Sequence, residues 1–321
     1  MIIAVAVVGC LCFAGGYFIG GGDGEDTTPV MVSGSTTVQP LMNAWASEYE
    51  KISDAAIYVS GGGSGTGRTN ANTKLSDIGM ASSATSSASF PNLVQHTIAF
   101  DAVVIVANFG SGAAITSLTI NDLKVLFLEA PGVTADTAAL PTLTPIYREY
   151  GSGTRETFVT SLGGLTDNDP SNTRGPFKLT GLERTSAGAM LRYINDTPNT
   201  IGFVNMNSLS EISGGTNVIY PNVKSLAVGV AGSAPANHIV PSAVSVQAWM
   251  NGDTATGYPM SRALFVLTLA DGSGLSPTAI GFLQWMYSAE AQQIVDDEGF
   301  VHLDPVTLKA QWEKVLRWPA I

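Results

Sequence analysis

The sequence predicts an α/β protein of two lobes, in which each lobe is a mixed sheet flanked by helices and two crossover strands join the lobes. The first observation behind this is a repeated order of short strand, Gly/Ser/Thr loop and helix, which is typical of α/β domains. The second is a pair of long apolar segments, residues 97–108 and 258–269, which we expect to be the strands that pass between the lobes. The third is composition: 321 residues, of which 45% are hydrophobic and 13% charged, suffice for two cores and are unlike a disordered chain.

The N-terminal segment is a candidate targeting signal. Residues 1–20 are almost wholly apolar and a Gly-rich acidic stretch follows them. We therefore expect residues 1–29 to be a signal peptide or membrane anchor plus a tether, and the rest of the chain to lie outside the cytoplasm, secreted or on the outer face of the membrane. The segment Val7-Val8-Gly9-Cys10 resembles a lipobox, so a lipoprotein attached through Cys10 stays open beside a cleaved signal. The other cysteine, Cys12, also lies in this segment, so the remaining chain has no disulfide and no thiolate site.

The remaining chain divides into predicted elements that alternate between strand and helix. The predicted strands are 30–33, 56–60, 77–81, 97–108, 144–148, 199–205 and 258–269. The predicted helices are 38–51, 67–74, 119–127, 154–162, 187–196, 278–288 and 290–298, followed by an amphipathic tail with Trp312 and Trp318. The two crossover strands assign residues 30–104 and 262–321 to the first lobe and residues 105–261 to the second.

Three short loops of Gly, Ser and Thr, at 33–37, 61–67 and 151–154, each precede a predicted helix. The unpaired N–H groups at a helix N-terminus make it an anion site, glycine allows close backbone approach, and hydroxyls add donors. Ligands of open α/β sheets bind beyond the carboxyl ends of the strands, where these loops fall. The loops therefore predict one small oxyanion, held in the cleft between the lobes.

Arg148 lies just ahead of the third loop. Its guanidinium is a fork of donors that fits a tetrahedral oxyanion, so we expect it to contact the ligand; the alternative is a surface ion pair with Glu149. Arg68 and Arg155 each follow a loop by one residue. Two interpretations stay open for them: they add to the positive field at the anion site, or they lie on the surface.

Other functions lack the residues that they need. A net charge of −11 disfavours nucleic acid as a partner. The second loop has no Gly-Lys-Ser/Thr ending, and neither Ser64 nor Ser152 lies in a Gly-x-Ser-x-Gly elbow. His96, His238 and His302 are isolated in the sequence. We therefore expect no cofactor, no metal and no enzymatic activity, and favour a binding protein.

These segments together resemble a known family. The chain after the leader is similar over nearly its whole length to the substrate-binding protein of the high-affinity phosphate ABC transporter. The resemblance rests on residues 34–40, 62–67, 77–83, 148–155, 200–204 and 258–260, with Arg148-Glu149-Tyr150-Gly151-Ser152-Gly153-Thr154 as its most specific part.

The resemblance implies a type II periplasmic-binding-protein fold that closes on phosphate and, as a monomer, delivers it to permease subunits. Carried onto this sequence, it implies ligand contacts from Ser35, Thr36, Thr37, Ser64, Arg148, Ser152, Gly153 and Thr154. Best-known members have a carboxylate just after the third strand, whereas Ser82 and Ser83 stand there in this chain. We expect one of these serines to contact the anion, with Ser83 favoured, although Asp77 or Asp101 could supply an acceptor instead. Phosphate is the expected ligand; sulfate, molybdate or tungstate in the same fold, and less favourably a phosphatase-type enzyme, remain alternatives.

Overall fold

A computed structural model of the chain describes residues 28–112, 115–128, 132–163, 176–177, 182–213 and 218–317. The expected signal or anchor, with Cys10, lies outside the described residues, as does Trp318. Within the described ranges, no helix combines the length and apolar character that a membrane span requires.

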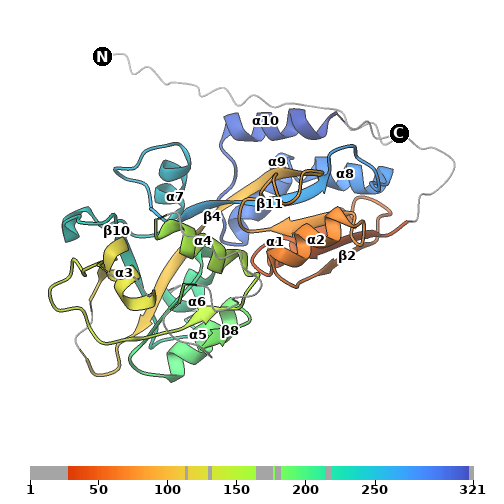
Figure 1. Ribbon diagram of the computed structural model, residues 1–321. Coiled ribbons are helices and arrows are strands. Elements are labelled where there is room, and N and C mark those ends of the chain that lie inside the picture. Colours follow the sequence, from red (N-terminus) through yellow and green to blue (C-terminus); the bar gives the residue numbers. More distant parts are fainter. Residues whose placement is uncertain are drawn as a thin grey trace, which may run out of the picture.

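A mixed sheet of nine strands runs through the molecule, and seven of the strands follow the order β2-β1-β3-β11-β4-β10-β5 (Figure 1). The strand β4, residues Leu93–Asn108, is common to both lobes. Nine of its first ten residues pair antiparallel with β11, residues Ser261–Leu269, and its last six pair antiparallel with β9, residues Thr200–Asn205. The predicted crossover strands are therefore confirmed as long, buried strands, and β4 continues from one lobe into the other.

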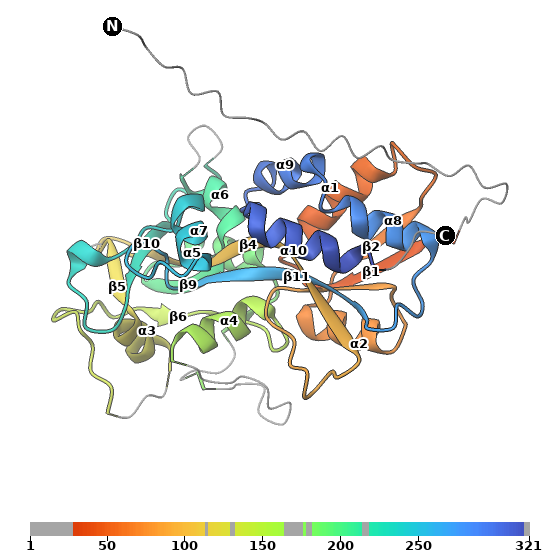
Figure 2. The same ribbon diagram turned by 90° about the horizontal axis from the view of Figure 1, so that it is seen from above.

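The first lobe contains both ends of the described chain. Strands β1 (Val30–Gly34), β2 (Ile57–Ser60) and β3 (Ile78–Ala81) are parallel, and β11 pairs antiparallel with β3. Figure 2 shows helix α2 on one face of these strands and helices α1, α8 and α9 on the other. The helices of this lobe are α1 (Gln39–Tyr49), α2 (Ser64–Asn72), α8 (Pro277–Trp285), α9 (Ala289–Asp297) and α10 (Pro305–Val315).

Packing within the first lobe ties its N-terminal part to its C-terminal part. The indole Nε1 of the buried Trp45, on α1, donates a hydrogen bond of 2.8 Å to the carbonyl oxygen of Ala291 on α9. The ring of Tyr49 lies 5.2 Å from that of Phe282 on α8. These contacts bury the apolar stripe of α1 against α8 and α9.

The second lobe is built from the middle of the chain and from the end of β4. Its core contains a stack of aromatic rings in which Phe158 and Phe203 have centroids 4.1 Å apart. Its strands are β5 (Ser117–Thr119), β6 (Thr144–Pro145), β9 and β10 (Lys224–Gly229), with β7 (Tyr147–Arg148) and β8 (Glu183–Arg184) as a separate pair. Its helices are α3 (Ile120–Phe127), α4 (Gly153–Ser161), α5 (Ala187–Asp196), α6 (Leu209–Ser213) and α7 (Ala243–Met250).

Most predicted elements differ from the observed ones only by a few residues at their ends, and two differ more. The strand expected at 144–148 is two short strands, because β6 pairs with β9 whereas β7 turns away to pair with β8. The helix expected to begin near Gly67 begins at Ser64, inside the glycine-rich loop, because Gly63 at its N-cap adopts a φ of 88°.

Candidate functional site

The three Gly/Ser/Thr loops meet where the two lobes touch. The Oγ1 atoms of Thr37 in the first loop and Thr154 in the third are 2.9 Å apart. The backbone N–H of Gly65 in the second loop donates to the carbonyl oxygen of Gly151 in the third, at 3.3 Å. The loops are therefore in direct contact across the lobe boundary, as the expected convergence requires.

The first loop is shaped by a glycine and a serine. Gly34 ends β1 with a φ of 138°, and a Cβ there would lie 2.3 Å from the carbonyl oxygen of Met80, so only glycine fits. The Oγ of Ser35 accepts hydrogen bonds from the backbone N–H groups of Thr37, at 3.2 Å, and Val38, at 3.4 Å. This turn starts α1 and leaves the side chains of Ser35 and Thr37 buried at the boundary.

The second loop places Ser64 at the first position of α2, where it is fully buried. Its Oγ accepts from the backbone N–H of Ser82 at 3.0 Å and lies 3.3 Å from the Ser82 Oγ. Gly67, one turn later, packs against β3, since a Cβ there would lie 2.2 Å from the Met80 carbonyl oxygen. Small residues thus bring α2 close enough to β3 for the two serines to meet.

The third loop supplies Ser152, Gly153 and Thr154 at the start of α4. Ser152 is the N-cap, and its Oγ accepts from the backbone N–H of Arg155 at 3.4 Å. A Cβ on Gly153 would lie 2.3 Å from the Oγ of Ser82 and 2.4 Å from the Oγ of Ser64. The start of α4 in the second lobe therefore lies directly on the two serines of the first lobe.

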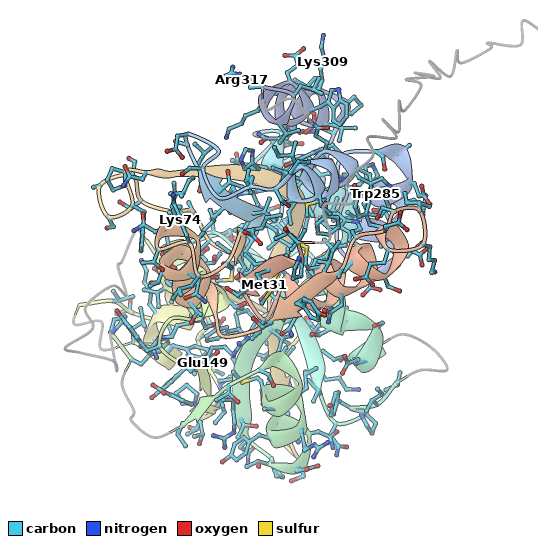
Figure 3. All side chains as sticks on the ribbon, turned by 90° about the vertical axis from the view of Figure 1, so that its right-hand side faces the viewer. Met31, Lys74, Glu149, Trp285, Lys309 and Arg317 are labelled. Carbon is cyan, nitrogen blue, oxygen red and sulfur yellow. The ribbon has the colours of Figure 1, made fainter. Side chains whose placement is uncertain are left out.

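Arg148 is buried, with 1% of its surface exposed, and it contacts both a carboxylate and the first loop. Its Nε and Nη2 donate to the two carboxylate oxygens of Glu149 at 2.9 and 3.0 Å. Its Nη2 also donates to the Oγ1 of Thr36 at 3.1 Å. The ion pair with Glu149 is thus present, but at the lobe boundary rather than on the outer surface; Figure 3 places Glu149 near that border, far from Lys309 and Arg317.

The two serines after β3 have different surroundings. Ser82 lies with Ser64, as described above. The Oγ of Ser83 instead donates to Glu156 Oε2 at 2.7 Å and accepts from Arg68 Nη2 at 2.6 Å. Arg68 and Glu156 are themselves 3.0 Å apart and come from different lobes. Ser83 therefore belongs to a neighbouring ion-pair network, and Ser82 is the serine that joins the loop cluster.

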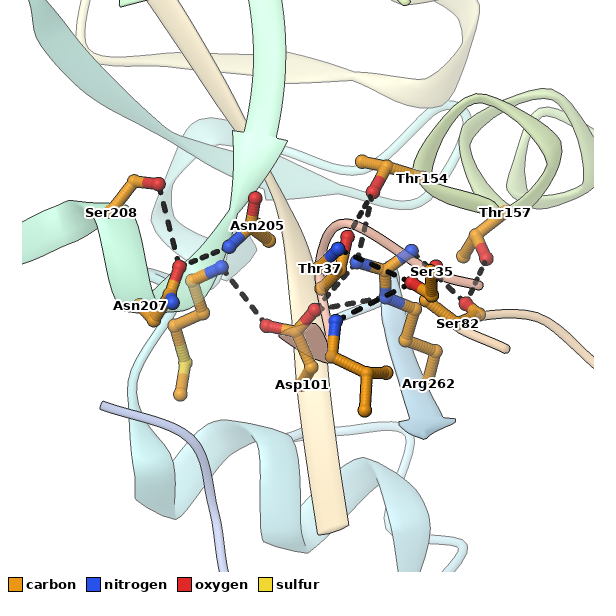
Figure 4. A network of polar contacts seen from close by, with 12 residues as sticks. Ser35, Thr37, Ser82, Asp101, Thr154, Thr157, Asn205, Asn207, Ser208 and Arg262 are labelled. Carbon is orange, nitrogen blue, oxygen red and sulfur yellow. Dashed lines mark hydrogen bonds and ion pairs between the residues drawn. The ribbon is translucent and has the colours of Figure 1, made fainter. Parts of the chain in front are cut away.

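A buried ion pair on the crossover strands completes the site, and the sequence reasoning did not assign it (Figure 4). Arg262 on β11 donates through Nε and Nη2 to Asp101 Oδ2 on β4, at 2.9 and 2.6 Å. Its Nη1 donates to the Ser82 carbonyl oxygen and its Nη2 to Thr154 Oγ1, both at 3.1 Å. The other oxygen of Asp101, Oδ1, accepts from the backbone N–H of Met206 at 3.0 Å. One guanidinium therefore contacts both lobes and the strand that crosses between them.

Arg262 keeps its charge although it is buried. Burial lowers the pKa of Arg262; attraction to Asp101 opposes that shift, and repulsion from Arg148 adds to it. Arginine stays protonated nonetheless, because its ordinary pKa is so high. A signal for the pair was present in the sequence: Asp101 and Arg262 are charged residues inside the two long apolar strands.

The remaining titratable candidates lie elsewhere. The carboxylate of Asp77 accepts from the backbone N–H of Met31 at 2.7 Å, which is a structural role at the start of β3. Burial, with a smaller effect of Lys314, lowers the pKa of His96 to about 3. Over the described ranges, no three His, Cys, Asp or Glu side chains form a group suited to a metal ion.

Two lobes crossed by two long strands, with hydroxyls and arginines gathered at their border, define the two-lobed binding-protein fold. The chain belongs to the PBP superfamily, since the family model described as PBP superfamily domain matches residues 21–290.

Individual relatives agree with this membership. The phosphate-binding protein PstS of Bacillus subtilis (strain 168) is 27% identical over 296 residues, which cover 89% of this chain and 83% of that protein. A putative phosphate ABC transporter substrate-binding protein from Clostridium perfringens, solved with bound phosphate, has a TM-score of 0.62 at 22% identity over 86% of this chain and 100% of its own. An ABC-type phosphate transport receptor from Vibrio cholerae has a TM-score of 0.62 at 20% identity, over 85% of this chain and 100% of its own. The structural likenesses show a shared fold.

Proposed function

We propose that this chain is an extracytoplasmic binding protein that captures inorganic phosphate between its lobes. It would then deliver the phosphate, as a monomer, to the permease subunits of an ABC transporter. The observation that carries the proposal is the meeting of three hydroxyl-rich loops, two of which open helices α2 and α4, with Arg148 beside them. The names of the Bacillus, Clostridium and Vibrio relatives support phosphate as the ligand.

The ligand contacts that we propose come from all three loops and from the turn after β3. Hydroxyl and backbone donors would surround the anion, and Arg148 would add a charge-assisted hydrogen bond in a site shut off from water. We assign these contacts to Ser35, Thr36, Thr37, Ser64, Ser82, Arg148, Ser152, Gly153 and Thr154, with Ser83 as a neighbour.

Closure of the lobes would bring these residues together. We propose that the lobes divide at residues 104/105 and 261/262, within β4 and next to the start of β11, so that these two strands act as the hinge. Motion of this kind around a ligand is known in periplasmic binding proteins. The segment 1–29 would keep the protein at the outer face of the membrane.

The charges around the site favour capture at short range. Four arginines near the boundary each pair with a carboxylate, so the pairs add no net charge, and the chain as a whole is acidic. A long-range field would therefore not attract an anion. Binding would depend on donors fixed in place before the ligand arrives, which limits the entropy lost on binding.

Calorimetric titration of the protein, freed of carried-over ligand by unfolding and refolding, tests the proposal. We expect saturable binding of one phosphate per chain. No heat and no protection against thermal unfolding by phosphate would refute it. A phosphatase-type enzyme would instead turn over a generic phosphoester and lose that turnover on Ser64→Ala.

A further inference from the structure

Five hydroxyl oxygens at the lobe boundary share one property: each already accepts a hydrogen bond from an N–H group. The donors are backbone N–H groups or arginine side chains. The oxygens are those of Ser35, from Thr37 N–H and Val38 N–H; Thr36, from Arg148; Ser64, from Ser82 N–H; Ser152, from Arg155 N–H; and Thr154, from Arg262.

This arrangement fixes the direction in which the hydroxyls donate. Arginine and backbone N–H groups have no acceptor atom, so a hydroxyl bound to one of them must accept, and its own hydrogen is left to donate elsewhere. Because Arg262 donates to Thr154 Oγ1, this oxygen must accept, and the Thr154 hydroxyl hydrogen points elsewhere. Thr154 and Thr37 share one hydrogen between their oxygens, 2.9 Å apart, and whichever of them donates, the other keeps a hydrogen for a further partner.

The carboxylates near the boundary are already occupied as acceptors. Both oxygens of Asp101 accept from N–H groups, of Arg262 and of Met206. Glu149 is paired with Arg148 through both of its oxygens. The carbonyl oxygen of Ser82 accepts from Arg262 at 3.1 Å and from Thr157 Oγ1 at 3.3 Å.

We infer that this site, taken as the oxyanion site proposed above, presents mainly donors and no carboxylate free of an N–H partner, and therefore favours a tetrahedral anion whose oxygens are all acceptors, with Arg262 as the residue that sets the hydroxyl direction of Thr154. A proton on the ligand would find hydroxyl lone pairs rather than a free carboxylate, and a hydrogen bond to a neutral acceptor is weaker than one to a charged acceptor. The dianion of phosphate is therefore favoured over the monoanion. Sulfate, which carries no proton at neutral pH, fits at least as well as phosphate.

Calorimetry on the wild-type full chain tests this with phosphate and sulfate from about pH 5.5 to about 8.5, a range in which sulfate keeps its charge. We expect the sulfate Kd near neutral pH to be no more than about tenfold above the phosphate Kd. We also expect phosphate to bind more tightly as pH rises through its second ionisation, while sulfate affinity stays level.

The outcomes separate this inference from the proposed function. Phosphate binding with sulfate weaker by more than about tenfold would overturn the inference and leave the proposed function intact. Sulfate binding without phosphate binding would support the inference and refute phosphate as the ligand. Binding of neither anion would refute both.

A matched pair of variants tests Arg262 as a positioning residue. Arg262→Gln replaces a donor-only group by one that can also offer an oxygen to Thr154. We expect it to weaken sulfate more than phosphate, so that the ratio of the two Kd values shifts by about tenfold. A structural role alone would weaken both anions equally, and that result would contradict the assignment.

Arg155→Gln is the control. Arg155 is also fully buried and paired with a carboxylate, Glu183 at 3.1 Å, and its Nη1 donates to the backbone carbonyl oxygen of Arg148 at 3.1 Å. We expect the Kd ratio to stay at the wild-type value. Should Arg262→Gln fail to fold because Asp101 loses its partner, the double variant Asp101→Asn/Arg262→Gln removes both charges and gives the same readout.

Discussion

Thr37 and Thr154 share a hydrogen bond of 2.9 Å between their Oγ1 atoms although they lie 117 residues apart in the sequence. Both side chains are buried, one in each lobe. The bond therefore exists only while the lobes are in contact, and it makes the pair a probe of closure.

A double-mutant cycle measures this coupling. Thr37→Val and Thr154→Val keep the side-chain shape and remove the hydroxyls. We expect each to weaken phosphate binding, and the double variant to lose about 1 kcal/mol less than the sum of the two. Calorimetric Kd values give the cycle, and strictly additive losses would contradict a direct coupling.

Arg148→Ala tests the charged contact of the third loop. We expect phosphate binding to weaken at least about tenfold, equivalent to about 1.4 kcal/mol, because a buried charge-assisted donor is lost. Arg192→Ala, at an exposed arginine on α5, is the control and should keep the wild-type Kd. An unchanged Kd in Arg148→Ala would remove this residue from the site.

Gly153→Ala tests the close packing of α4 on the two serines. The new Cβ would lie under 3 Å from the Oγ atoms of Ser64 and Ser82, so the lobes cannot close as they do in the wild type. We expect phosphate binding to weaken by about tenfold or more. Gly188→Ala on α5 is the matched control: its Cβ meets nothing within 4 Å, so binding should not change. Equal Kd values for the two variants would show that the contact does not matter.

Asp122 stabilises the start of α3 through its ionised form. Burial alone would raise its pKa, but hydrogen bonds from Thr119 and Thr137 outweigh that and lower it. The carboxylate therefore stabilises the fold above about pH 4, and this contribution is lost as pH falls through the lowered pKa. We expect Asp122→Asn to lower the free energy of unfolding at neutral pH by about 1–3 kcal/mol, because the amide nitrogen cannot accept. Urea titrations check this, with the exposed Asp54→Asn as control; a loss at pH 7 no larger than that of Asp54→Asn would disprove the role.

His96 should make the protein sensitive to mild acid. Its pKa of about 3 in the fold lies well below the ordinary value, so the unfolded chain binds a proton that the folded protein does not. Stability from neutral His96 is complete above about pH 6.5 and falls by about 1.4 kcal/mol per pH unit below it. His96→Gln should flatten this part of the curve, measured by urea unfolding between about pH 6.5 and about 4. His302→Gln, at an exposed histidine, is the control, and a slope unaltered by His96→Gln would contradict the prediction.

Local sequence signals were sufficient for much of the fold. Helix α5 was predicted with both its bounds because its apolar residues keep a helical period and Ser186 caps it. Helix α7 was not predicted, since AVSVQAWM is short and apolar around most of its circumference. Strand β10 was missed because six residues carry too little pattern to separate a strand from a loop.

For the candidate site, too, local sequence features could be predicted whereas contacts between distant residues could not. The loops were recognised from glycine and hydroxyl content, which is a local property. Arg262 was not, because its place depends on Asp101, 161 residues away, and on the register of β11 against β4. Which of Ser82 and Ser83 joins the cluster depends on the direction of each side chain after β3, which adjacent residues of the same type do not reveal.

The position of β11 also sets the order in which the protein can be completed during synthesis. Strand β3 pairs with β11 through Ala81 and Phe265, and the ribosome makes the second of these strands long after the first. All other strands of the sheet precede β11 in the chain, so the sheet of the second lobe is whole before the nascent chain reaches residue 261. The lobe that begins the chain is thus the last to be finished, and until then β3 and the first part of β4 remain open edges that a chaperone or another nascent chain can occupy.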